Sequence, residues 1–265
     1  MIYCIDKVNE YLYDGAFATP LIGTDKTLKS INRNELVKKF DQVYCPNNMI
    51  LCIVGDANFD DIVNFAEKNF ENNKGLVQQV KFSERNKEGI EERKGLTQSN
   101  LILTYHVPKA NNSKSYAAEI LNAILAGGMS SRLFHEIREK RNLAYSVKGD
   151  CDINKNYAFN LIYVGTNKDN VDKIKELIIE ELEKVSHELG NKELQEAKEQ
   201  LIGNYMISME DSQNQMINLL YSEISNNAEE YYKYEKNILN VKIEDVKELA
   251  EKAFRQHSFF ALNPK

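Results

Sequence analysis

Residues 127–147 read Gly-Gly-Met-Ser-Ser-Arg-Leu-Phe-His-Glu-Ile-Arg-Glu-Lys-Arg-Asn-Leu-Ala-Tyr-Ser-Val, and they decide the fold of the chain. The stretch predicts a tight turn, a helix and the start of a strand. Gly127 and Gly128 end the preceding helix, since the residue past a helix C-terminus often needs a positive φ. Ser130 or Ser131 is positioned to cap the next helix with its hydroxyl.

The middle of this stretch has the pattern of an amphipathic helix. Leu133, Phe134 and Ile137 fall at i, i+1 and i+4, which places them on one apolar face. Asn142 then ends the helix, because Asn tolerates the left-handed conformation better than most residues. A strand is predicted to begin at Leu143.

Composition narrows the class of protein. With 42% hydrophobic residues in 265, the chain is predicted to be an ordinary folded protein. A net charge of −6 argues against a nucleic-acid binder, which needs a basic surface. No apolar run reaches membrane-spanning length. The scattered cysteines indicate free thiols in a reducing compartment, so we expect a cytoplasmic protein without a membrane partner; they are Cys4, Cys45, Cys52 and Cys151.

Hydrophobic periodicity predicts an α+β chain. Helices are expected near residues 2–14, 30–44, 58–70, 113–125, 131–141, 167–189, 191–226, 229–239 and 243–253. Strands are expected near residues 49–54, 100–107, 143–152, 156–165 and 258–262. Between residues 73 and 97 charged residues dominate and periodicity is lost, which indicates a connection, with an edge strand near residues 77–82.

A helix-turn-strand unit occurs twice along the chain. Residues 31–52 match residues 241–262 at a constant offset of 210, with Leu36 opposite Val246 and Ile50 opposite Phe260. Chance similarity of two common units is the alternative. If the halves are duplicates, the first is expected to lack its beginning, because it has far fewer residues ahead of the matching unit.

The stretch at 127–147 closely resembles the C-terminal half of the M16 zinc peptidases, the pitrilysin/insulinase and mitochondrial-processing-peptidase-like family. Their pattern there resembles G-G-x-S-S-R-L-F-x-x-I-R-E-x-x-G-L-A-Y, and Asn142 replaces the usual glycine. Thr19-Pro20-Leu-Ile-Gly, Ser30-Ile31 and Tyr44-Cys-Pro46-Asn-Asn are similar to the end of the family's N-terminal half.

The resemblance implies tandem M16/LuxS-like metallohydrolase units, each an antiparallel sheet covered by helices, which enclose a peptide-binding chamber. Residues 1–75 are then expected to be the last third of the N-terminal unit. Residues 76–97 are expected to form a charged linker, and residues 98–265 a complete C-terminal, substrate-binding unit.

The family's metal site is absent from this sequence. M16 peptidases hold zinc with His-x-x-Glu-His and a downstream Glu, and the motif's Glu activates a water. No such pattern occurs here. His135-Glu136-Ile-Arg-Glu139 imitates the start of a His-Glu-x-x-His motif but ends in Glu, so we expect an exposed helix histidine, not a ligand. Neither a metal ligand nor a catalytic residue is predicted in this chain, and zinc is expected only in a missing or partner half.

The resemblance assigns substrate binding to Arg138 and Tyr145, which would point into the chamber near the zinc of the opposite half. Guanidinium and phenol groups donate hydrogen bonds to peptide carbonyls and to an oxyanion. The alternative is structural: Arg138 would pair with Glu136 or Glu139, and Tyr145 would pack within its strand. Arg132 and the Gly127–Gly128 turn are expected to be structural.

Two functions from different classes follow. In the first, the chain is the substrate-binding half of an M16-type zinc endopeptidase that hydrolyses peptides only with a zinc-bearing half or subunit. In the second, it is a non-catalytic scaffold or peptide-binding subunit. A third, a self-sufficient metalloenzyme using His135, is remote. Unpaired strand edges in the first unit predict association with a partner or with itself.

Overall fold

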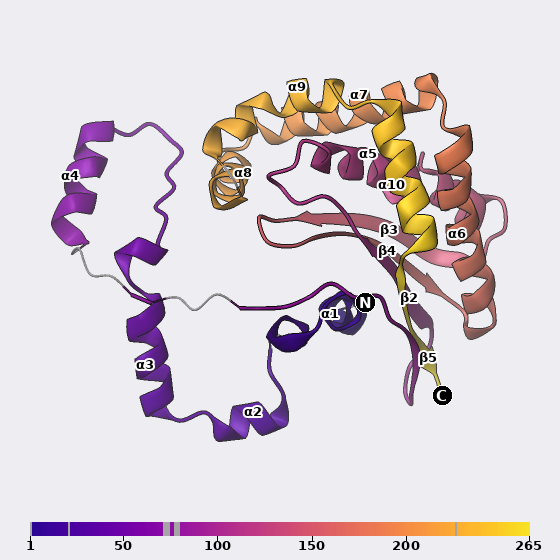
Figure 1. The fold of residues 1–265 in the computed structure, drawn as a ribbon, viewed down its shortest axis with the longest axis horizontal. Coiled ribbons are helices and arrows are strands. Elements are labelled where there is room, and N and C mark those ends of the chain that lie inside the picture. Colours follow the sequence, from indigo (N-terminus) through magenta and orange to yellow (C-terminus); the bar gives the residue numbers. More distant parts are fainter. Residues whose placement is uncertain (1, 21, 71–74, 77–79, 226) are drawn as a thin grey trace.

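A five-stranded sheet lies at the centre of the computed structural model, which describes residues 2–20, 22–70, 75–76, 80–225 and 227–265 (Figure 1). The strand order is β1-β5-β2-β4-β3. Neighbouring strands run antiparallel, except that β1 and β5 run parallel. The strands are β1 (Glu88–Arg93), β2 (Ser99–His106), β3 (Ala144–Ile153), β4 (Ala158–Thr166) and β5 (Ser258–Pro264).

Strand β4 shows how the sheet is buried on both faces. Every residue from Ala158 to Thr166 is buried. Because side chains alternate along a strand, Ile162 and Val164 join one apolar cluster while Leu161 and Tyr163 join another. The sheet therefore separates two cores.

Helices cover the larger core on one face of the sheet (Figure 1). Apolar stripes of α5 (Ser115–Ala126), α6 (Val171–Glu188) and α10 (Ile243–Arg255) pack there, with α7 (Asn191–Ser208) against α5. The predicted α+β class, a sheet covered by helices, is confirmed. The other helices that follow β1 in the sequence are η3 (Phe134–Glu139), η4 (Lys168–Asn170), α8 (Ser212–Ser225), η5 (Ala228–Lys233) and α9 (Tyr234–Leu239).

Helix α1 (Ile2–Leu12) covers the opposite face of the same sheet. Cys4, Val8 and Leu12 are buried there in one cluster with Phe260 of β5. Tyr11 meets the Phe260 ring edge-on at 5.2 Å between centroids. The first helix of the chain therefore packs against its last strand, β5.

The charged segment before β2 contains a strand that periodicity did not predict. Residues 88–93, expected to be part of the linker, form β1 and pair in parallel with β5. An edge strand with one solvated face keeps few apolar residues, and Ile90 is the one large apolar residue of β1. The predicted edge strand at 77–82 falls partly outside the described residues. The division into remnant, linker and complete unit stays a prediction.

Residues 15–20 and 22–69 form an arm. Its first turn stays against the sheet's second core, where Phe17 contacts the rings of Tyr13, Phe82 and Tyr157, and the rest extends away from the sheet (Figure 1). It contains η1 (Gly15–Ala18), α2 (Asp25–Ser30), α3 (Arg33–Val43), η2 (Pro46–Asn48) and α4 (Phe59–Asn69). Thr24 and Asn32 cap α2 and α3 through capping boxes, so local signals alone specify these helices. None of the three α-helices buries a residue in the described structure.

The strand predicted at residues 49–54 is wrong: this segment pairs with no strand among the described residues. Its apolar run lies exposed, with Ile50 at 50% whereas its counterpart Phe260 in β5 is at 0%. A strand needs a neighbouring strand to satisfy its backbone groups, and none of the described strands pairs with this segment. The helix half of the predicted repeat holds, since α3 and α10 begin at positions 33 and 243.

Candidate functional site

The signature stretch begins with a tight turn at the end of α5. The N–H of Gly127 donates to the Ala123 carbonyl, and a Cβ on Gly127 would lie only 2.5 Å from the Ala123 Cα. Gly128 has a φ of +151°, which side chains rarely adopt. Ser131 Oγ donates to the Gly128 carbonyl at 2.6 Å. The turn is therefore structural, as predicted.

The predicted helix is wider than an α-helix over most of its length. Residues Phe134–Glu139 form a π-helix, a rare geometry found often at functional sites. Within this helix, the Ile137 side chain is buried. Asn142 ends it with a φ of +50°, which confirms the left-handed position predicted from the glycine-to-asparagine replacement.

Arg132 is held in a partly buried ion-pair network. Its Nε and Nη2 donate to the two carboxylate oxygens of Glu193 at 2.6 Å each, and its Nη1 lies 3.6 Å from Glu181. The hydrogen bonds to Glu193 raise the pKa of the guanidinium. This paired arginine ties the signature helix to α6 and α7, which confirms its predicted structural role.

Arg138 lies exposed on the same helix, without a carboxylate partner among the described residues. Its guanidinium carbon lies 4.9 Å from the centre of the Phe134 ring. Glu136 instead pairs with Lys140 and Arg141. The described residues therefore contain no pair between Arg138 and Glu136 or Glu139, and the role of Arg138 stays a prediction.

Tyr145 lies on β3, the strand that contacts this helix. It is 60% exposed, and its hydroxyl donates to Asn167 Oδ1 at 2.9 Å. Most of the Tyr145 side chain therefore faces solvent, and its role also stays a prediction. Both side chains reach solvent from adjoining elements, although they make no hydrogen bond to each other in the described structure.

Comparison with known proteins shows the family of the chain. The family model described as "Peptidase M16 inactive domain" matches residues 30–201. The chain belongs to the peptidase M16 inactive-domain family. The matched range includes the whole signature stretch and begins inside the predicted remnant.

Relatives of this M16 domain are named as zinc proteases. The chain is 30% identical over 200 residues to "Uncharacterized zinc protease YmxG" of Bacillus subtilis, which covers 74% of the chain and 49% of that protein. It is 29% identical over 265 residues to an "Uncharacterized zinc protease" of Rickettsia felis, covering 94% and 62%. The chain spans about half to three-fifths of the curated relatives it matches.

Solved structures share the fold of this M16 domain. A protease from Helicobacter pylori matches with a TM-score of 0.88 at 22% identity, over 100% of this chain and 67% of that one. A peptidase M16 inactive domain from Pseudomonas fluorescens matches with a TM-score of 0.85 at 20% identity, over 99% and 65%. At these identities the likeness shows the fold.

The M16 domain brings no set of metal ligands together in the part of the chain that the structure describes. His135 is exposed and its Nδ1 contacts the carboxylate of Glu139. His106 Nε2 contacts the Arg85 carbonyl and His257 Nδ1 the Ala253 carbonyl. These residues do not fit the zinc site of a peptidase. None of the described helices is long and apolar enough to cross a membrane.

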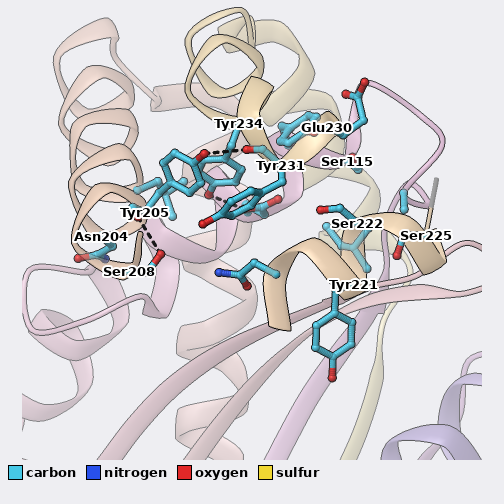
Figure 2. A pocket seen from close by; sticks show the side chains of 16 residues that line it. Ser115, Asn204, Tyr205, Ser208, Tyr221, Ser222, Ser225, Glu230, Tyr231 and Tyr234 are labelled. Carbon is cyan, nitrogen blue, oxygen red and sulfur yellow. Dashed lines mark hydrogen bonds between the residues drawn. The ribbon is translucent and has the colours of Figure 1, made fainter. Parts of the chain in front are cut away.

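A cavity that the sequence analysis missed lies on the helical side of the domain, between α5, α7, α8, η5 and α9 (Figure 2). Glu119 of α5 and Tyr234 of α9 both line it. One signal was available in the sequence: Glu119 is the one charged residue in residues 117–126, which are apolar apart from Glu119 and Asn122. Hydrophobic periodicity predicts only a helix here and gives no indication that Glu119 lines a cavity.

Proposed function

We propose that this chain is the substrate-binding half of an M16-type zinc endopeptidase, and that it hydrolyses peptides only with a zinc-bearing half or subunit. The observation that carries the proposal is the exposure of Arg138 and Tyr145 on the family's signature elements, with Arg138 free of a carboxylate partner in the described structure. A free guanidinium beside solvent retains its donors for a ligand.

In this function Arg138 and Tyr145 bind the peptide backbone. Each donates hydrogen bonds to carbonyl oxygens of the substrate, and to the oxyanion that forms when water attacks the scissile carbonyl. Asn167 orients Tyr145, because it accepts the hydrogen bond of the phenol while no substrate is bound. The zinc and the activated water belong to the other half, since the histidines here do not converge.

The surface that would receive the other half is the arm. Its apolar residues are exposed on α3 and along residues 49–54, where a folded domain rarely leaves so many together. The exposed large side chains are Leu36, Val37, Phe40, Tyr44, Met49, Ile50, Leu51 and Ile53. Segments of a zinc-bearing half would cover them and pair with the backbone of residues 49–54.

The alternative is a non-catalytic M16-like scaffold or peptide-binding subunit. The absence of His-x-x-Glu-His from the sequence favours it. The two functions differ in what Arg138 does, because a scaffold that only binds peptides does not use an oxyanion donor.

A cleavage assay separates them. A quenched-peptide mixture with added zinc would be incubated with this chain alone, and with a zinc-motif half from the same genome. We expect no cleavage by the chain alone and cleavage by the mixture. Arg138→Ala and Tyr145→Phe should each lower kcat/KM of the mixture by about 100- to 1,000-fold, the range for loss of an oxyanion donor.

Two control variants test whether the loss is local. Arg255→Ala removes an exposed arginine on α10 that pairs with Glu251, and Tyr232→Phe alters an exposed tyrosine of η5. Both should leave kcat/KM unchanged. Cleavage by the chain alone that a chelator abolishes would overturn the proposal, and an inactive mixture that still binds peptide would favour the scaffold.

A further inference from the structure

The cavity beside α5 has the size of a ligand site. Its volume is about 450 Å³, within the roughly 300–1,000 Å³ typical of small-molecule pockets. Figure 2 shows Tyr205, Tyr231 and Tyr234 gathered together, with Ser222 and Ser225 of α8 nearby. Arg138 and Tyr145 are not among the residues that line it.

Glu119 is an uncompensated acid in the wall of this cavity. The Tyr234 hydroxyl donates to its Oε2 at 2.6 Å, and no lysine or arginine in the described structure lies within ion-pair distance of it. A carboxylate accepts about four hydrogen bonds. Glu119 therefore retains acceptor capacity toward the cavity, whereas the other lining acid, Glu230, is paired with Lys233 at 3.0 Å.

Tyr231 supplies a second unpartnered polar group. The residue is 5% exposed, it lines the cavity, and its hydroxyl has no hydrogen-bond partner in the part of the chain that the structure describes. Asn218, also a lining residue, lies near this hydroxyl without reaching hydrogen-bond geometry. Leaving a buried hydroxyl unpaired is costly, and a ligand group that forms a hydrogen bond with it would remove that cost.

Aromatic rings form much of the remaining wall. The Tyr205 and Tyr234 rings lie 4.7 Å apart between centroids, and the Tyr116 and Tyr234 rings 6.0 Å apart. The faces of tyrosine rings attract cations. A carboxylate surrounded by such rings provides both the counter-charge and the cation–π surface that ammonium and guanidinium groups prefer.

We propose that this cavity binds an organic cation, an ammonium or guanidinium group such as the end of a lysine or arginine side chain. Glu119 is the counter-ion, Tyr231 and Asn218 accept hydrogen bonds from the cation's N–H groups, and the rings of Tyr205 and Tyr234 pack against it. This site is separate from the one formed by Arg138 and Tyr145, so it stands without the function proposed above.

Binding should depend on pH in a defined direction. Burial raises the pKa of Glu119 to about 7, although the hydrogen bond from Tyr234 opposes the shift. The titratable groups that face it are Tyr116, Tyr234 and Cys151, and burial raises the pKa of each, so they stay neutral near pH 7. A cation binds the ionised carboxylate, so affinity should rise between pH 6 and pH 8.

Calorimetry on the full chain provides the test, with backbone-capped amino acids as probes. We expect capped lysine and arginine to bind more tightly at pH 8 than at pH 6. Capped citrulline and norleucine, their uncharged isosteres, should bind at least about tenfold more weakly. Butylammonium carries the same cation as lysine without the capped backbone. Affinity equal to that of capped lysine would show that the cation alone is recognised.

Variants identify the residues responsible. Glu119→Gln should lower the affinity for capped arginine by about 10- to 100-fold and remove its pH dependence. Tyr231→Phe should weaken binding without lowering the melting temperature, because its hydroxyl loses no partner within the protein. Glu229→Gln, an exposed carboxylate beside the cavity, and Arg138→Ala should leave binding unchanged. Equal affinity for arginine and citrulline, absence of binding, or full affinity in Glu119→Gln would overturn the proposal.

Discussion

Glu119 has a pKa that burial in the fold shifts far from the ordinary value of a glutamate. Its pKa of about 7 lies above the ordinary value of 4.5, so the folded state retains a proton that the unfolded chain releases between these values. Stability contributed by such a group is present below pH 4.5 and is lost as pH rises through 7. The loss amounts to at most about 3 kcal/mol.

Replacing Glu119 by Gln should therefore stabilise the protein at high pH and not at low pH. Urea unfolding followed by circular dichroism would compare the two proteins from pH 4.5 to pH 8. The variant should match the parent near pH 4.5 and exceed its free energy of unfolding progressively above it. Glu229→Gln is the control, since an exposed carboxylate should give no such divergence. A difference that does not change with pH would contradict the burial of Glu119.

Asn142 and Arg132 are residues whose structural roles could be predicted from the sequence. A left-handed position and a paired arginine are local requirements of one turn and one helix, and both are confirmed. Glu119 could not be interpreted in this way, because its environment is built by Tyr234, which lies 115 positions further along the chain.

At the scale of elements, α3 and α10 are a natural comparison. They occupy equivalent places in the predicted repeat, and both form as predicted. Periodicity is a local signal in both helices, and α3 also has the Asn32 cap. Their surroundings differ: Val246 of α10 is fully buried, whereas Leu36 of α3 is 58% exposed. The sequence prediction missed strand β1 and placed a false strand at residues 49–54. Both errors arise because a strand forms only beside a neighbouring strand, which local sequence does not show.

Matched truncations should reveal this difference. Val246→Ala should lower the free energy of unfolding by about 1–3 kcal/mol through lost burial. Leu36→Ala should change it by less than about 0.5 kcal/mol in the isolated chain. Urea unfolding measures both. In a mixture with a zinc-bearing half, Leu36→Ala should instead weaken association, and a large loss of stability in the isolated chain would show that α3 is already covered.

For the whole molecule, the contrast lies between a sheet that is buried on both faces and an arm that buries almost nothing. Helix α1, at the start of the chain, covers one face of the sheet, and strand β5, at its end, lies within the sheet between β1 and β2. The arm exposes apolar side chains and an unpaired extended segment at residues 49–54. Such surfaces promote edge-to-edge pairing and aggregation.

The chain alone should therefore associate with itself. Size-exclusion chromatography with light scattering should give a mass that rises with concentration above that of a monomer. A variant carrying Phe40→Glu and Ile50→Lys should stay monomeric, because charges on α3 and the extended segment oppose burial and strand pairing. Val80→Lys, which adds a charge at an exposed apolar position before β1, is the control and should still associate. A parent chain that remains a clean monomer when concentrated would show that the arm is stable in solution without a partner, and would remove the main physical reason for expecting one.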